Sequence, residues 1–320
     1  MKLACLIIFT ILSIGLSLFV GTADLSMSQS LSGLLGHGSE LENLIMQQLR
    51  LPRAAMAAFI GAGLGASGAA LQGYTRNPLA APGILGFSAC AAFGAVVALY
   101  FGFSNFVPFA ALAGAALGAG LILLMTGPRK SASTLILAGV GIGALATAFT
   151  GLLMNFAPNP WALSEIVYWL MGSLQNAELS GLMICGPFTV LGLAILFYLG
   201  PDLQAMSLGE DTAVSLGVSL SRVKWALIVG VALCVGSGVA IAGAIGFVGL
   251  FIPHILRFLF GVNPTRLIPL SAIGGAGFLA AADMVTRLLS GPGTTLYLGI
   301  LTSLIGVPFF LWLALREMRA

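Results

Sequence analysis

The residue types that most often carry chemistry are sparse in this sequence. An enzyme nucleophile needs a neighbouring base, and a metal site needs several ligands at close spacing. The two histidines, His37 and His254, lie far apart, and neither pairs with an Asp or Cys cluster. The four cysteines each lie inside an apolar run, without paired spacing: Cys5, Cys90, Cys185 and Cys234. The sequence therefore predicts no catalytic residue and no metal site. It indicates a hydrogen-bonded structural role for His254 and packing roles for the cysteines.

One short stretch, 207–217, concentrates polar side chains in a chain that is only 7% charged. Ser207 followed by Glu210 is the pattern of a capping box, and Glu210 and Asp211 suit the positive end of a helix dipole. Gly217 is well placed to end the helix. One narrow face repeats every four residues and consists of Leu208, Thr212 and Leu216. A helix of about nine residues is unstable alone in water, so we expect it to dock on its own membrane domain or on a cytoplasmic partner.

The rest of the chain suits a lipid environment. Its mean hydropathy is +1.07, whereas about a quarter of a soluble protein's residues are charged. A membrane helix takes about 20 apolar residues, so a chain of 320 residues allows about ten spans with short loops. The 43 glycines fit closely packed membrane helices. The sequence predicts an all-α polytopic membrane protein with about ten transmembrane helices.

Apolar runs between helix breakers locate these spans. We expect them at about 3–21, 54–73, 86–104, 108–126, 133–155, 181–199, 223–243, 247–261, 267–289 and 296–315. The first run follows Lys2 and resembles a signal peptide, but it is longer than the usual signal core. We interpret it as a retained helix.

The distribution of Lys and Arg predicts the orientation. With a cytoplasmic N-terminus and ten alternating spans, ten of the 13 basic residues lie inside. These are Lys2, Arg76, Arg129, Lys130, Arg222, Lys224, Arg257, Arg266, Arg316 and Arg319. The other three, Arg50, Arg53 and Arg287, lie outside. We therefore expect a multi-pass membrane protein with both termini in the cytoplasm.

This topology gives one transmembrane domain over residues 1–320. We expect an external segment at 22–52 and a cytoplasmic coupling segment at 203–222. A second external segment, 156–180, contains Glu165 and Glu178 and no basic residue.

The sequence has no P-loop, and this argues against ATP hydrolysis by this chain. A P-loop has the pattern G-x-x-x-x-G-K-[ST], and none of Lys2, Lys130 and Lys224 follows a glycine. If transport is ATP-driven, the ATPase is a separate subunit. In that case ATP and Mg bind on the partner ATPase, and we expect no cofactor in this chain.

Several motifs resemble one transporter family. They are "RLPRAAMAAFIGAGLGASGAALQGYTRNPLAAPGILG" (50–86), "STLILAGV" (133–140), "SLGEDTAVSLGV" (207–218), "AGAIGFVGLFIPHILR" (242–257), "ADMVTRLL" (282–289) and "IGVPFFLWLA" (305–314). Together they are similar to the permease subunits of binding-protein-dependent ABC importers for iron–siderophores, haem and vitamin B12. The similarity runs from about residue 50 to the C-terminus.

The resemblance implies a type II ABC importer permease architecture and an assembly. It implies a location in the bacterial inner (cytoplasmic) membrane. It also implies a homodimer, two copies of a P-loop ATPase subunit and a periplasmic substrate-binding protein. It also implies that the polar stretch is the coupling helix, seated on the ATPase. The coupling residues would then be Ser207, Leu208, Gly209, Glu210, Asp211, Thr212, Leu216 and Gly217.

The resemblance gives the external arginines a role as well. Residues matching Arg50, Arg53 and Arg287 meet acidic side chains of the binding protein in such importers, and guanidinium groups bind carboxylates in a bidentate fashion. Snorkelling at the interface is the alternative. For Arg287, a helical pair with Asp283 four residues before it is another.

A cytoplasmic gate is implied at the break "RNPLAAPG" (76–83). In similar importers Asn77 and Leu79 lie at this gate, opposite the loop that matches Ser131 and Ser133. The alternative is a plain turn forced by Pro78 and Pro82. The sequence departs from the family at two positions. Tyr297 replaces a proline of many relatives, and Ala132 replaces a gate threonine of the vitamin B12 importers.

Two other classes of function are weighed against the importer. An ion-coupled secondary transporter needs ionisable residues at mid-membrane, and only Asp283 lies well within a predicted span. A membrane enzyme needs a catalytic cluster, which the sequence lacks. A path for bare metal ions would need imidazole and carboxylate ligands. A chelated metal is therefore the expected solute: a ferric siderophore first, then haem or vitamin B12.

Overall fold

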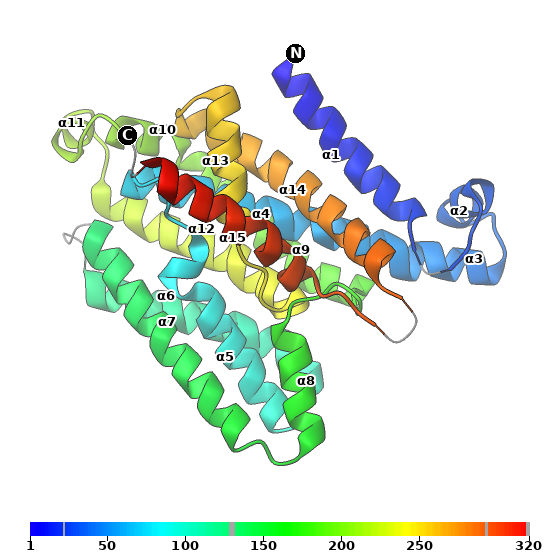
Figure 1. Cartoon of the computed structure of the whole chain (residues 1–320). Helices are drawn as coiled ribbons and strands as arrows, with labels where there is room; N and C mark the ends of the chain where they lie inside the picture. Colours follow the sequence, from blue (N-terminus) through cyan, green and yellow to red (C-terminus); the bar gives the residue numbers. More distant parts are fainter. Residues whose placement is uncertain (22, 128–131, 292–293, 318–320) are drawn as a thin grey trace.

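The computed structural model describes residues 1–21, 23–127, 132–291 and 294–317, and these residues form helices and turns without a strand. Each predicted span corresponds to a helix (Figure 1). These helices are α1 (Lys2–Phe19), α4 (Leu51–Thr75), α5 (Phe87–Tyr100), α6 (Val107–Thr126), α7 (Ala132–Asn155), α9 (Leu179–Tyr198), α12 (Leu220–Ala242), α13 (Val248–Phe260), α14 (Pro264–Leu289) and α15 (Leu298–Glu317). Seven helical segments of the described chain could cross a membrane by length and composition, and α5, α13 and α15 are shorter apolar helices. The all-α polytopic prediction is confirmed.

Short elements connect these helices. They are α2 (Met27–Leu34), α3 (Glu40–Leu44), α8 (Pro160–Leu170), α10 (Gly200–Met206) and α11 (Glu210–Ser215). A π-helical turn, η1 (Ile45–Arg50), joins α3 to α4, and 3-10 turns lie at η2 (Pro82–Leu85) and η3 (Ser104–Phe106). In Figure 1, α10 and α11 lie at one end of the molecule, and α2 and α3 lie at the other.

Helix α4 is the central helix and packs against α14, α12, α13 and α9. Three of its glycines touch neighbouring backbone, as the sequence predicts for small-residue rows in membrane helices. A Cβ on Gly61 or Gly65 would collide with the carbonyl oxygens of Gly275 and Ser271 in α14. Gly246, by contrast, has open space around it.

The remaining helices surround this centre. Helix α1 lies along α14, and α5 packs against α6 and α7. Helix α12 joins the two groups because it packs against α4, α9, α5 and α6. Chain direction then fixes which helix ends meet. The C-terminal ends of α1, α5, α12 and α14 lie at the end of the molecule opposite α11, together with the N-terminal ends of α4, α6 and α9.

Candidate functional site: two docking surfaces and a cavity

The predicted coupling segment forms a shorter helix than expected. Ser207 does not cap it, because the Ser207 hydroxyl donates to the Gln204 carbonyl at 2.6 Å and its amide donates to Leu203 and Gln204. Ser207 therefore belongs to the end of α10, and the predicted capping box is wrong. Gly209, with φ +112, is the N-cap residue of α11, so no side chain caps the start of this helix. Helix α11 has 6 residues, and Gly217 follows it with φ +87.

The apolar side chains around α11 are largely exposed. Leu208 is 67% exposed, Leu216 64% and Val214 54%, whereas Ala213 is fully buried. Thr212 is exposed as well. Ala213 holds the segment to the molecule, and the Val218 amide donates to its carbonyl at 3.0 Å. Val214 on α11 and the two leucines that flank the helix form an apolar surface that a partner could cover.

Two ion pairs lie beside α11. Nη2 of Arg76, at the end of α4, lies 3.9 Å from Oε1 of Glu210, and both side chains are about half exposed. Nη2 of Arg222 lies 2.9 Å from Oδ2 of Asp202. Exposed pairs of this kind contribute about 0–1 kcal/mol. They orient the segment more than they stabilise it.

The predicted gate residues lie in a turn that is anchored from inside. Oδ1 of Asn77 accepts a bond from the Leu79 amide at 2.9 Å. The buried Gln72 side chain donates to the Ala80 carbonyl at 3.3 Å, and Arg257 donates to Gln72 at 2.8 Å. Ser133 is exposed at the start of α7. Ser131 lies outside the described residues, so the gate stays a prediction.

At the opposite end, Arg50 holds the end of α1. Its guanidinium donates to the carbonyls of Leu18 at 3.2 Å, Phe19 at 3.1 Å and Ala23 at 2.6 Å. The last carbonyls of a helix have no partner within the helix, so Arg50 satisfies a need that the backbone creates. Arg50 itself is buried.

Arg53 and Arg287 share one carboxylate. Asp283 of α14 is fully buried, and Nη2 of Arg53 lies 2.8 Å from its Oδ1 while Nη2 of Arg287 lies 3.2 Å from its Oδ2. The helical pair of Asp283 with Arg287, one alternative from the sequence, is therefore present. Arg287 also bonds to the Ser17 hydroxyl at 2.5 Å and to the carbonyls of Ser17 and Val20.

The three arginines line one small pocket, which we call the basic pocket. Its volume is about 250 Å³, and Gln175, Ala177, Thr286 and Ser290 complete much of its wall. Three guanidinium groups beside one carboxylate leave two positive charges in excess. The pocket can accept a carboxylate side chain, but docking at these arginines stays a prediction because all three already bond within the chain.

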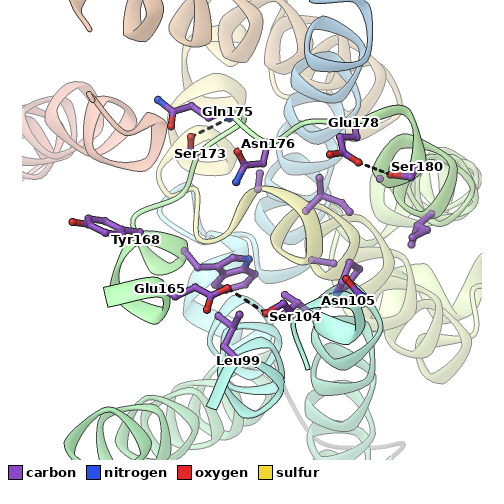
Figure 2. Close-up of a pocket in the computed structure, with 18 of the residues that line it drawn as sticks. Leu99, Ser104, Asn105, Glu165, Tyr168, Ser173, Gln175, Asn176, Glu178 and Ser180 are labelled. Carbon is purple, nitrogen blue, oxygen red and sulfur yellow. Dashed lines mark hydrogen bonds between the residues drawn. The ribbon is translucent and has the colours of Figure 1, made fainter. Parts of the chain in front are cut away.

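A second and larger hollow, the acidic cavity, lies beside the basic pocket, and Gln175 lines both. Its volume is about 880 Å³. Its wall comes from the end of α5, the start of α6, α8, the 173–181 segment, the end of α12 and Tyr297 (Figure 2). Glu165 and Glu178 belong to this wall, each with a serine hydroxyl at 3.3 Å.

Tyr297, where we expect the sequence to depart from the family, lies in this wall. Its ring stacks on Tyr168 of α8, with centroids 6.1 Å apart and planes 8° apart. Tyr297 therefore adds a contact between α8 and the start of α15. Sequence reasoning recognised Tyr297, Glu165 and Glu178 separately, but it missed the cavity because the wall combines segments that are distant along the chain.

His254 has the structural surroundings that the sequence indicates. It is buried, and its ring lies 5.3 Å from Phe258 and 5.6 Å from Phe309. Among the described residues no group of three or more His, Cys, Asp or Glu could hold a metal ion.

Comparison with known proteins agrees with this architecture. The model of the FecCD transport family matches residues 6–316. The chain is 39% identical over 287 residues to the vitamin B12 import system permease protein BtuC of Vibrio cholerae, covering 87% of this chain and 85% of that protein. It is 37% identical over 308 residues to the iron(3+)-hydroxamate import system permease protein FhuB of Bacillus subtilis, covering 95% and 80%. A solved inward-facing structure, described as a metal-chelate type ABC transporter, covers 98% of this chain and 99% of its own, with a TM-score of 0.89 and 34% identity. With motifs, fold and relatives in agreement, the chain belongs to the FecCD transport family.

Proposed function

We propose that this chain is the membrane subunit of a binding-protein-dependent ABC importer that moves a chelated metal compound into the cytoplasm. A ferric siderophore is the first expectation, and haem or vitamin B12 follows. The observation that carries the proposal is the exposed apolar surface of α11, on a chain whose family consists of such permeases. The chain does no chemistry on the solute.

The ATPase partner would seat on α11. Leu208, Val214 and Leu216 are exposed, and burying such side chains against a partner releases about 1.5–3 kcal/mol each. Two ATPase subunits would bind two copies of this chain, one below each α11. ATP binding would bring the ATPases together, and Arg76, bridged to Glu210, would pass the movement to the turn at 76–81 and its gate residues Asn77 and Leu79.

The binding protein would dock at the opposite end. The basic pocket has two positive charges in excess and a volume suited to one acidic side chain. Arg53 is the most accessible candidate there, because 17% of its side chain is exposed, against 7% for Arg287. An acidic side chain of the binding protein would compete with Asp283 for these guanidinium groups.

An ion-coupled secondary transporter is the alternative, and Asp283 decides against it. A proton or sodium relay needs a carboxylate that can exchange its partner during transport. Asp283 is fully buried between Arg53 and Arg287 and accepts bonds from both. Its bonding is that of a structural carboxylate.

Copurification tests the proposal directly. The tagged chain is purified in mild detergent from its native membrane, and co-purifying proteins are identified by mass spectrometry. We expect a P-loop ATPase at stoichiometric yield. Purification of the chain alone from gently solubilised, transport-active membranes would contradict the importer and favour ion coupling.

A further inference from the structure

The acidic cavity combines three properties that small-molecule sites share. It is concave, its volume of about 880 Å³ falls within the usual range of ligand pockets, and aromatic side chains line it. Its wall is built from helix ends that lie opposite α11, where the solute would arrive. The basic pocket beside it, at about 250 Å³, is too small for a whole metal chelate.

The charge of the acidic cavity is one-sided. Among the described residues that line it are Glu165 and Glu178 and no lysine, arginine or histidine. Each carboxylate accepts one serine hydroxyl, from Ser104 and Ser180 respectively, and both glutamates are exposed (Figure 2). A carboxylate has about four lone-pair sites, so each retains capacity for a cationic donor.

Aromatic faces strengthen the same preference. Trp161 is 85% exposed and Tyr168 57% exposed, and both line the cavity with Trp169 and Tyr297. A cation over an aromatic face is attracted by about 0.5–2 kcal/mol. Indole and phenol rings also offer flat apolar area to an organic chelate. Amide groups of Asn105, Gln175 and Asn176 add neutral hydrogen-bonding partners.

We propose that the acidic cavity is an entry site that selects chelates by charge: it binds metal chelates carrying a cationic group and disfavours polyanionic ones. This inference rests on the proposed function, because it assigns a solute class to the same importer. Glu165 and Glu178 attract the cation, and the exposed faces of Trp161 and Tyr168 contact the organic part. The positive charge of the basic pocket lies beyond Gln175 and is partly neutralised by Asp283.

A matched pair of chelates tests the charge preference. Ferric desferrioxamine B carries a free ammonium group, and its N-acetyl derivative is the same trihydroxamate without that charge. Binding to the purified chain in nanodiscs is followed by quenching of tryptophan emission. We expect the cationic chelate to bind about tenfold more tightly than the acetylated one, the size of one favourable cation contact. Ferric citrate, a polyanion, should give no saturable quenching.

Variants locate the site. Glu165→Gln with Glu178→Gln keeps shape and the serine bonds, so it should abolish the preference and leave the acetylated chelate unaffected. Glu40→Gln, which removes an exposed charge at the same end outside the cavity, is the matched control. Trp161→Phe should reduce the quenching amplitude. Trp225→Phe, near the other end of α12, should leave the saturable component intact.

Equal affinity for the two chelates would overturn the inference, as would a preference that survives the double glutamine variant or an absence of saturable quenching. A further outcome is that the two chelates bind equally while the double glutamine variant docks the binding protein more weakly. In that case the glutamates bind a cationic side chain of the binding protein and not the chelate.

ATP-dependent uptake separates this inference from the proposed function. The assembled transporter in proteoliposomes is supplied with ferric trihydroxamates, ferric citrate, haem and cobalamin. Uptake of any of these solutes, without a preference for the cationic chelate, would contradict the charge-selective entry site and support the proposed importer function. A preference for the cationic chelate in binding, without uptake of any of these solutes, would support the binding site in the acidic cavity and contradict the proposed importer function.

Discussion

The α11 segment and the external arginines were both predicted to dock partners, yet the structure presents them in opposite states. Leu208 and Leu216 are exposed and contact little of their own chain, whereas Arg50 and Arg287 are buried and bonded to carbonyls and to Asp283. The difference follows from the cost of leaving each group alone. Leaving a leucine side chain exposed to water costs little free energy. A buried guanidinium group is costly unless hydrogen-bond acceptors surround it. Docking on α11 therefore adds new contacts, whereas docking at the arginines must replace hydrogen bonds that they already make within the chain.

We expect the largest effect from removal of the Asp283 carboxylate, which Arg53 and Arg287 share. Asp283→Ala leaves Arg53 and Arg287 side by side without a carboxylate, and breaking such a buried pair costs about 3–5 kcal/mol. Thermal unfolding in detergent should show a clear fall in stability. Asp202→Ala, which breaks the exposed pair with Arg222, is the control and should change little. Equal stability of the two variants would show that the cluster is not structural.

The next effect concerns the exposed surface. Leu208→Asp with Leu216→Asp should reduce ATPase copurification at least about tenfold, because two apolar contacts are replaced by charges. Thermal stability should be unchanged, since both side chains are exposed. Leu35→Asp with Leu41→Asp, which alters equally exposed leucines near the other end, is the matched control. Normal ATPase yield from the first variant would exclude α11 as the seat.

Glu210→Lys examines the same surface through charge. It reverses one member of the pair with Arg76 and places two cations together. We expect transport to be uncoupled, or the ATPase lost, while the spans remain folded. Wild-type uptake by this variant would contradict the coupling role.

Salt concentration distinguishes the two kinds of docking without any substitution. Raising ionic strength from about 0.1 to 1 M shortens the screening length from about 10 to 3 Å. Binding-protein affinity should fall severalfold because it depends on guanidinium–carboxylate attraction. ATPase association, which depends on apolar contact, should change less. The reverse order would exchange the two assignments.

The smallest expected effect is at Arg76. Arg76→Ala removes a half-exposed pair worth about 0–1 kcal/mol, so stability should hardly move. A fall in the ratio of solute transported to ATP hydrolysed, measured in proteoliposomes, would show that the pair couples α11 to the turn at 76–81. An unchanged ratio would reduce it to an ordinary surface pair.

The helices were predictable because each one is a local property of the sequence. Apolar runs bounded by breakers placed the ten apolar helices of the described chain, and the many glycines indicated close helix packing of the kind found at Gly61 and Gly65. The cap of α11 was mispredicted because Ser207 continues α10, a helix that the pattern of polar residues does not reveal. The bonds of Arg50 and the wall of the acidic cavity join segments far apart in sequence. Their geometry depends on packing that single-sequence patterns do not encode.

The glycine contact between α4 and α14 bears on how the transporter can move. The backbones meet at Gly61 with Gly275 and at Gly65 with Ser271, where a Cβ on either α4 glycine would overlap a carbonyl oxygen of α14. We therefore expect the two helices to move as one unit. We then expect the movements of a transport cycle to occur in the helices around this pair, so that a displacement at one end of α4 and α14 reaches their other end.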